Sequence, residues 1–268
     1  MRRWLWCVFA CLTVGCNSTP DGPSPELEPT PAPAPTVTPT VELEQLGKAD
    51  PVAFLERCRD KTAREIKATR GTLLMRERVQ GKVGPQERIL FSFRDRPYGI
   101  RMEWKEGVKL ARKTLFVAGE NDGHMLAQPV GWRSLAGIVR CKPDSEDAMS
   151  SSRMPITEFG MQKGIESTVK VWQAARERGE LRVAFSGPKT IPQLGDRPVW
   201  ELKRTGYKAA EFDGILQSTY YVDTQTCLQV GIHLLGKGDD LVGMYYFRDL
   251  EINPAFGKDT FTRDGLKK

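Results

Sequence analysis

The clearest hydrophobic pattern along the chain is a period of two over residues 88–104. Alternate positions are apolar in "RILFSF" and again in "YGIRMEW", and the turn Asp95-Arg96-Pro97 separates the two runs. Successive side chains of a strand point to opposite faces, so this alternation predicts an antiparallel hairpin with one apolar face. The apolar positions that share this face are Ile89, Phe91, Phe93, Tyr98, Ile100, Met102 and Trp104.

Other segments continue the strand pattern. "KLARKTLFVAG" and "HMLAQP" flank Asn121-Asp122-Gly123, which is a typical hairpin turn. Residues 130–156 are rich in Ser, Asp and Gly and are expected to form an irregular insertion. Five more strands are expected towards the C-terminus, in "LRVAFSG", "RPVWELKRTG", "ILQSTYYVD", "LQVGIHLLG" and "LVGMYYFRDLEI".

Two stretches have the helical period instead. In "PVAFLERCRDKTAREI" the apolar positions fall on one face, and Asp50 followed by Pro51 is typical of a helix N-terminus. A second helix is expected in "TEFGMQKGIESTVKVWQAARERG", with Trp172 on its apolar side. Strands follow one another without βαβ alternation, so the pattern predicts the α+β class with an antiparallel sheet.

The N-terminus predicts export. Arg2 and Arg3 precede the uncharged run Trp4–Val14, which is shorter than the roughly 20 residues that span a bilayer. The end of this run, "LTVGC", resembles the bacterial lipobox, although Thr13 stands where Leu is usual. The resemblance implies a signal peptide over residues 1–15 and lipidation of Cys16. An ordinary secretory signal that happens to end before a cysteine is the alternative.

Residues 16–47 are expected to link this anchor to the folded part of the chain. Proline recurs from Pro20 to Pro39, and such a composition favours an extended polyproline II stalk. The folded domain is then expected over residues 48–268. Asn17 after the lipidated cysteine favours the outer membrane, facing the periplasm, over the inner membrane.

Charge and cysteine content restrict the function further. The chain has 40 Lys and Arg against 34 Asp and Glu, without a basic run typical of nucleic-acid binding, so no nucleic-acid partner is expected. Beyond Cys16, the exported chain keeps Cys58, Cys141 and Cys227. One disulfide with a free thiol and three buried thiols both fit this number.

No catalytic or metal-binding motif is evident. His124 and His233 have no partner at zinc-ligand spacing, and "GIHLLGKG" carries Gly238 where a P-loop needs Ser or Thr. A G-x-S-x-G nucleophile elbow is also missing. We therefore expect no enzyme activity, no metal and no cofactor.

Five segments together resemble a bacterial family of secreted proteins and lipoproteins of unknown function: "DPVAFLERC", "NDGHML", "SSRMPITEFG", "YYVDTQTCLQV" and "YFRDLEINPAF". The similarity extends over residues 48–262, and Cys227 stands where the hairpin of this family usually has Gly. That family is distantly similar to the lipoprotein-sorting proteins LolA and LolB and to the N-terminal domain of RseB. The resemblance implies a curved antiparallel sheet, an incomplete barrel, with helices across its concave side and an apolar cavity.

The function then depends on what fills the apolar side of the sheet. The leading hypothesis is a lipid-anchored envelope protein that binds an acyl chain, a lipid or a lipidated protein in an apolar groove, without catalysis. The alternative is an envelope scaffold or sensor with a filled core, which recognises a protein partner through its loops. The candidate groove residues are Phe91, Phe93, Ile100, Met102, Trp104 and Trp172.

Overall fold

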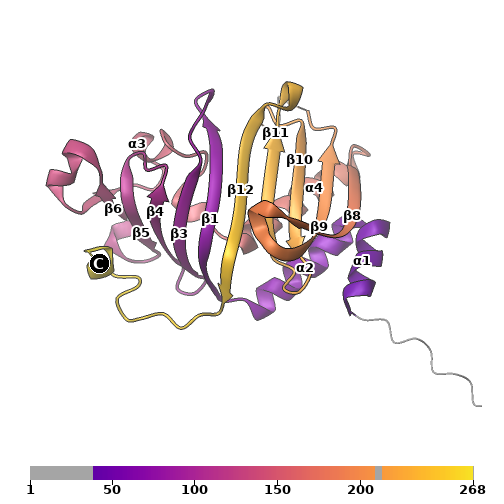
Figure 1. The fold of residues 1–268 in the computed structure, drawn as a ribbon, viewed down its shortest axis with the longest axis horizontal. Coiled ribbons are helices and arrows are strands. Elements are labelled where there is room, and N and C mark those ends of the chain that lie inside the picture. Colours follow the sequence, from indigo (N-terminus) through magenta and orange to yellow (C-terminus); the bar gives the residue numbers. More distant parts are fainter. Residues whose placement is uncertain (1–38, 209–212, 268) are drawn as a thin grey trace, which may run out of the picture. The chain divides into compact units, whose positions relative to one another are not determined.

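The computed structural model describes residues 39–208 and 213–267. The predicted signal peptide over 1–15, the lipidation site Cys16 and the predicted linker up to residue 38 lie outside the described residues. The predicted α+β class is confirmed, because one large antiparallel sheet carries a few helices (Figure 1).

The sheet has twelve strands in the order β7-β6-β5-β4-β3-β1-β12-β11-β10-β9-β8, with β2 beside β1. It is open rather than closed into a barrel, and β7 and β8 form its two ends. The strands are β1 (Ala68–Val79), β2 (Lys82–Val83), β3 (Glu87–Arg94), β4 (Gly99–Glu106), β5 (Ala111–Val117), β6 (Met125–Pro129), β7 (Val139–Cys141), β8 (Arg182–Ile191), β9 (Gly195–Thr205), β10 (Gln217–Asp223), β11 (Gln229–Leu235) and β12 (Leu241–Ile252).

Two halves meet at the pairing of the first strand with the last. Strands β1 to β7, residues 68–141, form the first half, and strands β8 to β12, residues 182–252, form the second half. Strand β1 joins them by pairing with β12, for example Leu73 opposite Phe247. The predicted hairpin lies in the first half, where Phe91 is opposite Met102 and Phe93 is opposite Ile100.

The helical segments connect and flank these strands. Helix α2 begins where the sequence predicts, because the Asp50 carboxylate accepts hydrogen bonds from the backbone N–H groups of Val52 and Ala53, both at 3.0 Å. The helices are α1 (Pro39–Ala49), α2 (Pro51–Glu65), α3 (Glu146–Met149), α4 (Met161–Glu177) and α5 (Arg263–Lys267). The 3₁₀ turns are η1 (Asn121–Gly123), η2 (Gly131–Ala136), η3 (Ile156–Glu158), η4 (Pro192–Leu194) and η5 (Lys237–Asp239).

The end of the predicted linker is a helix. Residues 39–47 belong to α1, so the folded part begins ahead of the boundary predicted at residue 48. Leu43 and Leu46 are three residues apart on one side of α1 and pack against the core of the second half. Gly47 permits this close approach, since a Cβ there would lie 2.1 Å from the Phe185 ring. The Pro-rich composition around Pro39 hid this helix because proline is tolerated in a first helical turn.

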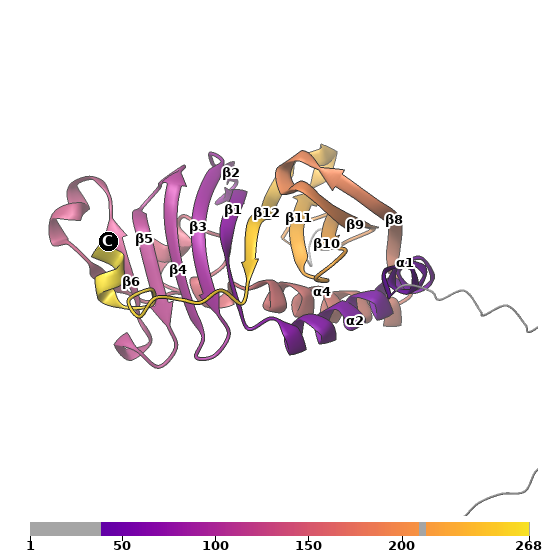
Figure 2. The ribbon, with the colours of Figure 1, turned by 60° about the horizontal axis from the view of Figure 1, so that its bottom comes forward.

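The two halves are covered differently on the same face of the sheet, which we call the covered face. Helices α2 and α4 lie across the second half (Figure 2) and enclose a core that contains Phe54, Trp172 and Trp200, none of them exposed. The first half is covered by residues 142–160, a mostly irregular segment with two short helical turns, of which Ile156 and Phe159 pack on the sheet.

The opposite face of the first half is covered by the C-terminal segment. Phe256, Phe261 and Leu266 pack there against Leu115 and Leu126. Leu115 alternates along β5 with Phe116, which belongs to the core under residues 142–160, so the two clusters lie on opposite faces of the sheet.

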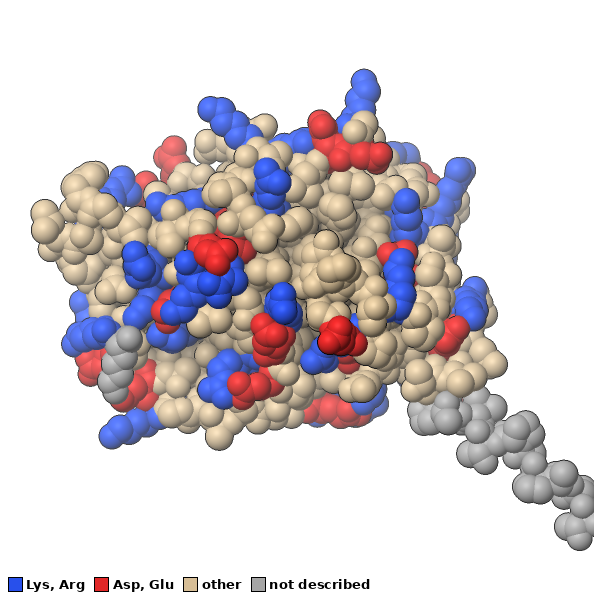
Figure 3. Space-filling model, viewed as in Figure 1, with Lys and Arg blue, Asp and Glu red and all other residues tan. Residues whose placement is uncertain are grey.

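The irregular insertion expected over residues 130–156 also contains β7, which adds an edge strand to the sheet. Acidic and basic side chains are intermixed on the molecular face drawn in Figure 3. Across the described ranges, no helix has the length and apolar character needed to cross a membrane.

Candidate functional site

Four of the six predicted groove residues meet on the covered face of the first half. Phe91 and Phe93 on β3 are 2% and 8% exposed, and Ile100 and Met102 on β4 are 0% and 8% exposed. All four belong to one apolar cluster. The alternation in the sequence therefore identified correctly which side chains share this face.

Residues 156–159 cover this cluster on the side that faces away from the sheet. The Phe159 ring packs between the rings of Phe91, Phe93 and Phe247, with centroid distances of 5.3, 5.9 and 5.9 Å. Tyr98 holds the segment in place, since its hydroxyl donates hydrogen bonds to the backbone oxygens of Ile156 at 2.8 Å and Phe159 at 3.0 Å. The apolar face is thus filled by side chains of the chain itself.

The two predicted tryptophans differ from these four residues and from each other in position. Trp104 is half-buried at the margin of the cluster, and its indole N–H donates to a carboxylate oxygen of Glu87 at 2.6 Å. Trp172 belongs to the core of the second half, where its ring is 5.3 Å from that of Tyr220. A single groove lined by all six predicted residues is therefore not formed in this structure.

Two buried glutamates lie at one end of the covered face, beside Trp104. Glu77 on β1 and Glu87 on β3 are 2% and 1% exposed. The Tyr245 hydroxyl donates to Glu77 at 2.6 Å, and the Lys109 ammonium lies 2.5 Å from Glu87. Burial raises the pKa of Glu87, the hydrogen bonds from Lys109 and Trp104 oppose this rise, and the neighbouring charge of Glu77 adds to it.

Sequence reasoning missed this acidic pair, although the sequence contained a signal. Glu77 has the same parity along β1 as Leu73 and Met75, and Glu87 has the same parity along β3 as Ile89. A glutamate at an inward position of an alternating strand must be buried with a partner, because an unpaired buried charge costs several kcal/mol.

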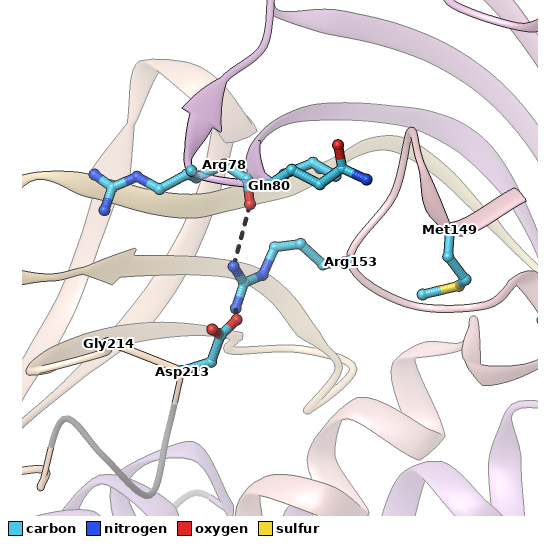
Figure 4. A pocket seen from close by; sticks show the side chains of 8 residues that line it. Arg78, Gln80, Met149, Arg153, Asp213 and Gly214 are labelled. Carbon is cyan, nitrogen blue, oxygen red and sulfur yellow. Dashed lines mark hydrogen bonds and ion pairs between the residues drawn. The ribbon is translucent and has the colours of Figure 1, made fainter. Parts of the chain in front are cut away.

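A surface hollow of about 470 Å³ lies near this acidic pair, at the turn between β1 and β2. The Arg153 guanidinium reaches into it and donates to the backbone oxygen of Arg78 at 3.2 Å and to the Asp213 carboxylate at 2.5 Å (Figure 4). The described residues that line this hollow include no serine, cysteine or histidine. The arrangement is suited to polar contacts.

A second hollow of about 550 Å³ lies between α1 and α2. Leu43 and Leu46 form its apolar floor, and Arg57, Lys61 and Arg64 supply positive charge. Neither hollow is lined by any predicted groove residue. Within residues 39–208 and 213–267, no group of three or more His, Cys, Asp or Glu side chains could hold a metal ion.

Among the described residues, the most exposed large apolar side chains lie on η2, between β6 and β7. Trp132 is 80% exposed and Leu135 is 92% exposed. Leu110, 38% exposed, is adjacent, because its backbone oxygen accepts a hydrogen bond from Val130 at 3.1 Å. We call these residues and Arg133 the apolar tip. The sequence placed this segment in an irregular insertion and gave no indication that its apolar side chains face solvent.

The apolar tip has a fixed backbone and a polar border. The Ser134 hydroxyl donates to the backbone oxygen of Gly131 at 2.7 Å, and the Gly137 N–H donates to Ser134 at 3.0 Å. The guanidinium of Arg133 lies 5.6 Å from the centre of the Trp132 ring and 3.9 Å from the Asp147 carboxylate. Such a tip presents an aromatic and an aliphatic anchor in a defined arrangement.

Among the solved structures that are similar to the chain is MucB. MucB, which is also present in a complex structure of Pseudomonas aeruginosa MucA/MucB, is 15% identical with a TM-score of 0.46; the match covers 81% of this chain and 63% of MucB. The chain thus spans less than two thirds of MucB.

Two further structures are similar. The Mycobacterium tuberculosis lipoprotein LppX is 10% identical with a TM-score of 0.44, covering 77% of this chain and 98% of LppX. A LolA superfamily protein from Nitrosomonas europaea is 8% identical with a TM-score of 0.29, covering 79% and 99% of the two chains. No curated protein matches the chain. The family described as "Protein of unknown function (DUF1571)" matches residues 67–265, and the chain belongs to this family.

Proposed function

We propose that this protein is a non-enzymatic binding module of the bacterial cell envelope that recognises a protein partner through the apolar tip. In this proposal Cys16 carries the lipid anchor, the protein faces the periplasm from the outer membrane, and the sheet is a scaffold. The observation that carries the proposal is a contrast in exposure: Phe91 and Ile100 are buried under the chain's own side chains, whereas Trp132 and Leu135 are exposed.

The chemistry of the apolar tip favours a protein over a lipid surface. Trp and Arg are enriched among residues that dominate protein interfaces, and a polar border around an apolar centre is typical of such interfaces. Two of the cations near the tip are paired with acids: Arg133 with Asp147 at 3.9 Å and Arg140 with Asp122 at 2.7 Å. A loop that binds anionic lipid is expected to keep such cations unpaired.

The rigidity of the apolar tip supports the same proposal. The hydrogen bonds of Ser134 and Gly137 fix the backbone of η2 before any partner arrives. A preorganised loop loses little conformational entropy on binding, so two anchoring side chains can contribute more of their contact energy to affinity. Tethering to a membrane would also raise the effective concentration of the module near partners in the same membrane.

Photo-crosslinking in intact cells tests this proposal. A photoreactive amino acid replaces Leu135 in the full chain, and the matched control carries it at Leu90, an outward position on β3 that is 37% exposed. We expect a discrete protein adduct from position 135 that is reduced at least tenfold at position 90 and that the additional substitution Trp132→Ala abolishes. Lipid adducts alone, or equal adducts at both positions, would contradict the proposal.

A second candidate function is acyl-chain binding on the covered face of the first half. The observation in its favour is that a 3₁₀ turn and one aromatic ring, Phe159, cover this face, whereas helices cover the second half. An acyl chain could take the place of the Phe159 ring if residues 156–159 moved away. Each buried CH₂ contributes about 0.8 kcal/mol, so a long chain could offset this displacement.

Dye displacement separates the two candidates. A hydrophobic dye is offered to the full chain, then fatty acid is added as competitor. Acyl-chain binding predicts dye uptake that fatty acid reverses, stronger uptake by Phe159→Ala and none by the double variant Phe159→Ala, Phe91→Glu. No uptake by the wild type and by Phe159→Ala, both folded by circular dichroism, would exclude it.

A further inference from the structure

We propose that Cys58 and Cys227 are joined by a disulfide in the exported protein, with Cys141 left as a free thiol. The inference goes beyond the proposed function and needs only that the chain meets an oxidising compartment. It decides between the two cysteine arrangements that fit the sequence.

The position of the two thiols is the first observation. Cys58 lies on the buried side of α2 and is 0% exposed, and Cys227 lies in the turn between β10 and β11 and is 1% exposed. Both belong to the same buried cluster, the core of the second half, and the two thiols are close enough to influence each other. Cys141 lies on the edge strand β7 and packs against the other core. Only one of the three pairings is therefore available.

The backbone at Cys227 is the second and independent observation. Its φ of 62° lies in the left-handed region, where Gly is favoured and a residue with a Cβ costs about 1–2 kcal/mol. The turn that imposes this conformation is built on Asp223, whose carboxylate accepts from the backbone N–H of Thr226 at 2.6 Å and is paired with Arg197 at 2.9 Å. A thiol at a position that favours Gly is explained if its sulfur forms a covalent bond.

The two thiols influence each other in the folded protein. The hydrogen bond from Cys58 lowers the pKa of Cys227, and the positive charge of Lys61 contributes to this effect. The same hydrogen bond, together with burial, raises the pKa of Cys58. Both effects require the two sulfurs to be neighbours in the folded protein.

The oxidant we assign is a protein disulfide of the CxxC class. The thiolate of one cysteine of the pair attacks one sulfur of that disulfide, and the other sulfur leaves as a thiolate. The thiolate of the second cysteine then attacks the sulfur of the first, so that the Cys58–Cys227 bond forms and the oxidant leaves with both sulfurs reduced. Two electrons and the two thiol protons of the pair pass to the oxidant.

Burial determines when this exchange takes place. Neither thiol is accessible once α2 lies on the sheet, so the oxidant must act before α2 docks. After docking, the same burial protects the disulfide from reductants. The bond would fasten the helix layer of the second half to the β10–β11 turn, in addition to the hydrogen bond from Thr62 of α2 to Gln162 of α4 at 2.7 Å.

Peptide mapping of the full chain, exported with its own N-terminus, tests the pairing directly. The protein is alkylated under denaturing conditions without reductant and cleaved after lysine, which places Cys58 in residues 49–61, Cys141 in residues 114–142 and Cys227 in residues 209–237. We expect the first and third peptides to be linked and the Cys141 peptide to be alkylated. Alkylation of all three peptides, or a link to Cys141, would overturn the proposal.

Thermal unfolding of the purified protein provides a second readout. Reduction in denaturant followed by refolding is expected to lower the Tm of the wild type by about 5–15 °C, as for removal of a disulfide that closes a long loop. Refolding in the presence of oxidised glutathione instead should restore the Tm, because the thiols then meet the oxidant before α2 docks. The matched control Cys141→Ser should show the same shift, and Cys58→Ser should show none. A wild-type Tm that does not respond to reduction would also overturn the proposal.

Discussion

In the second half of the sheet, helices α2 and α4 enclose a core with Trp172 and Trp200 at its centre, and both side chains are fully buried. In the first half, residues 156–159 close the same face, and the ring of Phe159 stays half-buried. A helix buries a continuous apolar stripe, whereas a 3₁₀ turn contributes single side chains. One face of a single sheet is therefore covered by two packed helices over the second half and by a short segment with few buried side chains over the first half.

The largest expected effect lies in the helix-covered second half. Replacing Trp172 with Ala removes a large, fully buried side chain between α4 and the sheet. We expect the free energy of unfolding to fall by about 3–5 kcal/mol in urea titration. A fall in the free energy of unfolding of less than about 1 kcal/mol would mean that α4 is not the main element packed on this half of the sheet.

A somewhat smaller effect is expected at the buried acidic pair. Replacing Lys109 with Met leaves Glu87 without its ion pair beside Glu77, which is expected to cost about 3 kcal/mol at pH 7. The control Lys105→Met removes an exposed partner of Glu103 and should cost at most about 1 kcal/mol. Equal losses in the two variants would show that Glu87 is not held by Lys109.

The pH dependence at Glu87 has a definite sign. Its pKa is raised in the folded state, so the folded protein binds the proton more tightly than the unfolded chain. The contribution of Glu87 to stability therefore falls as pH rises from the ordinary glutamate range through the raised pKa. We expect the penalty of Lys109→Met to shrink in urea titrations at pH 5 relative to pH 7. A penalty that does not change with pH would contradict the raised pKa.

The lightly closed first half should respond less to loss of its covering ring. Phe159→Ala removes contacts with Phe91, Phe93 and Phe247 from a half-buried side chain. We expect a loss of about 2 kcal/mol, below that of Trp172→Ala, measured in the same titration. If Phe159→Ala were the more destabilising change, the order of the two halves would be reversed.

The smallest effect on stability is expected at the apolar tip. Trp132→Ala and Leu135→Ala change exposed side chains and should alter the free energy of unfolding by less than about 0.5 kcal/mol. Trp132→Ala should also abolish the protein adduct formed by the photoreactive amino acid at position 135. Destabilisation beyond about 1 kcal/mol would mean that these side chains support the fold instead.

The sequence predicted the strands and helices better than it predicted which segments cover the apolar face of the sheet. Alternation around Phe91 and Ile100 identified the apolar face of the hairpin, and Asp50 identified the start of α2, because both signals are local. The same alternation is expected whether a ligand or the chain itself covers that face. Phe159 lies in the stretch that the sequence predicted as the start of the second helix, but α4 begins only at Met161, and Phe159 follows the 3₁₀ turn η3 instead. Nothing in the sequence indicated that its ring covers the sheet.

Contacts between residues far apart along the chain account for the other differences between the prediction and the structure. Leu43 and Leu46 make α1 stable only because the core of the second half accepts them. The contact of Cys58 with Cys227 joins residues far apart along the chain and depends on the docking of α2. Exposure of Trp132 depends on what the rest of the fold leaves uncovered. The local pattern of apolar and polar residues does not show which distant segments come together or which side chains stay exposed.

Native mass spectrometry of the full chain, extracted from membranes and freed of detergent in the gas phase, tests the filled covered face most directly. We predict a single species with the mass of the lipid-modified polypeptide and no further adduct, because Phe159 occupies the space above Phe91 and Phe93. A non-covalent fatty acid or phospholipid bound one to one, retained by the wild type and lost in Phe91→Glu, would contradict this prediction.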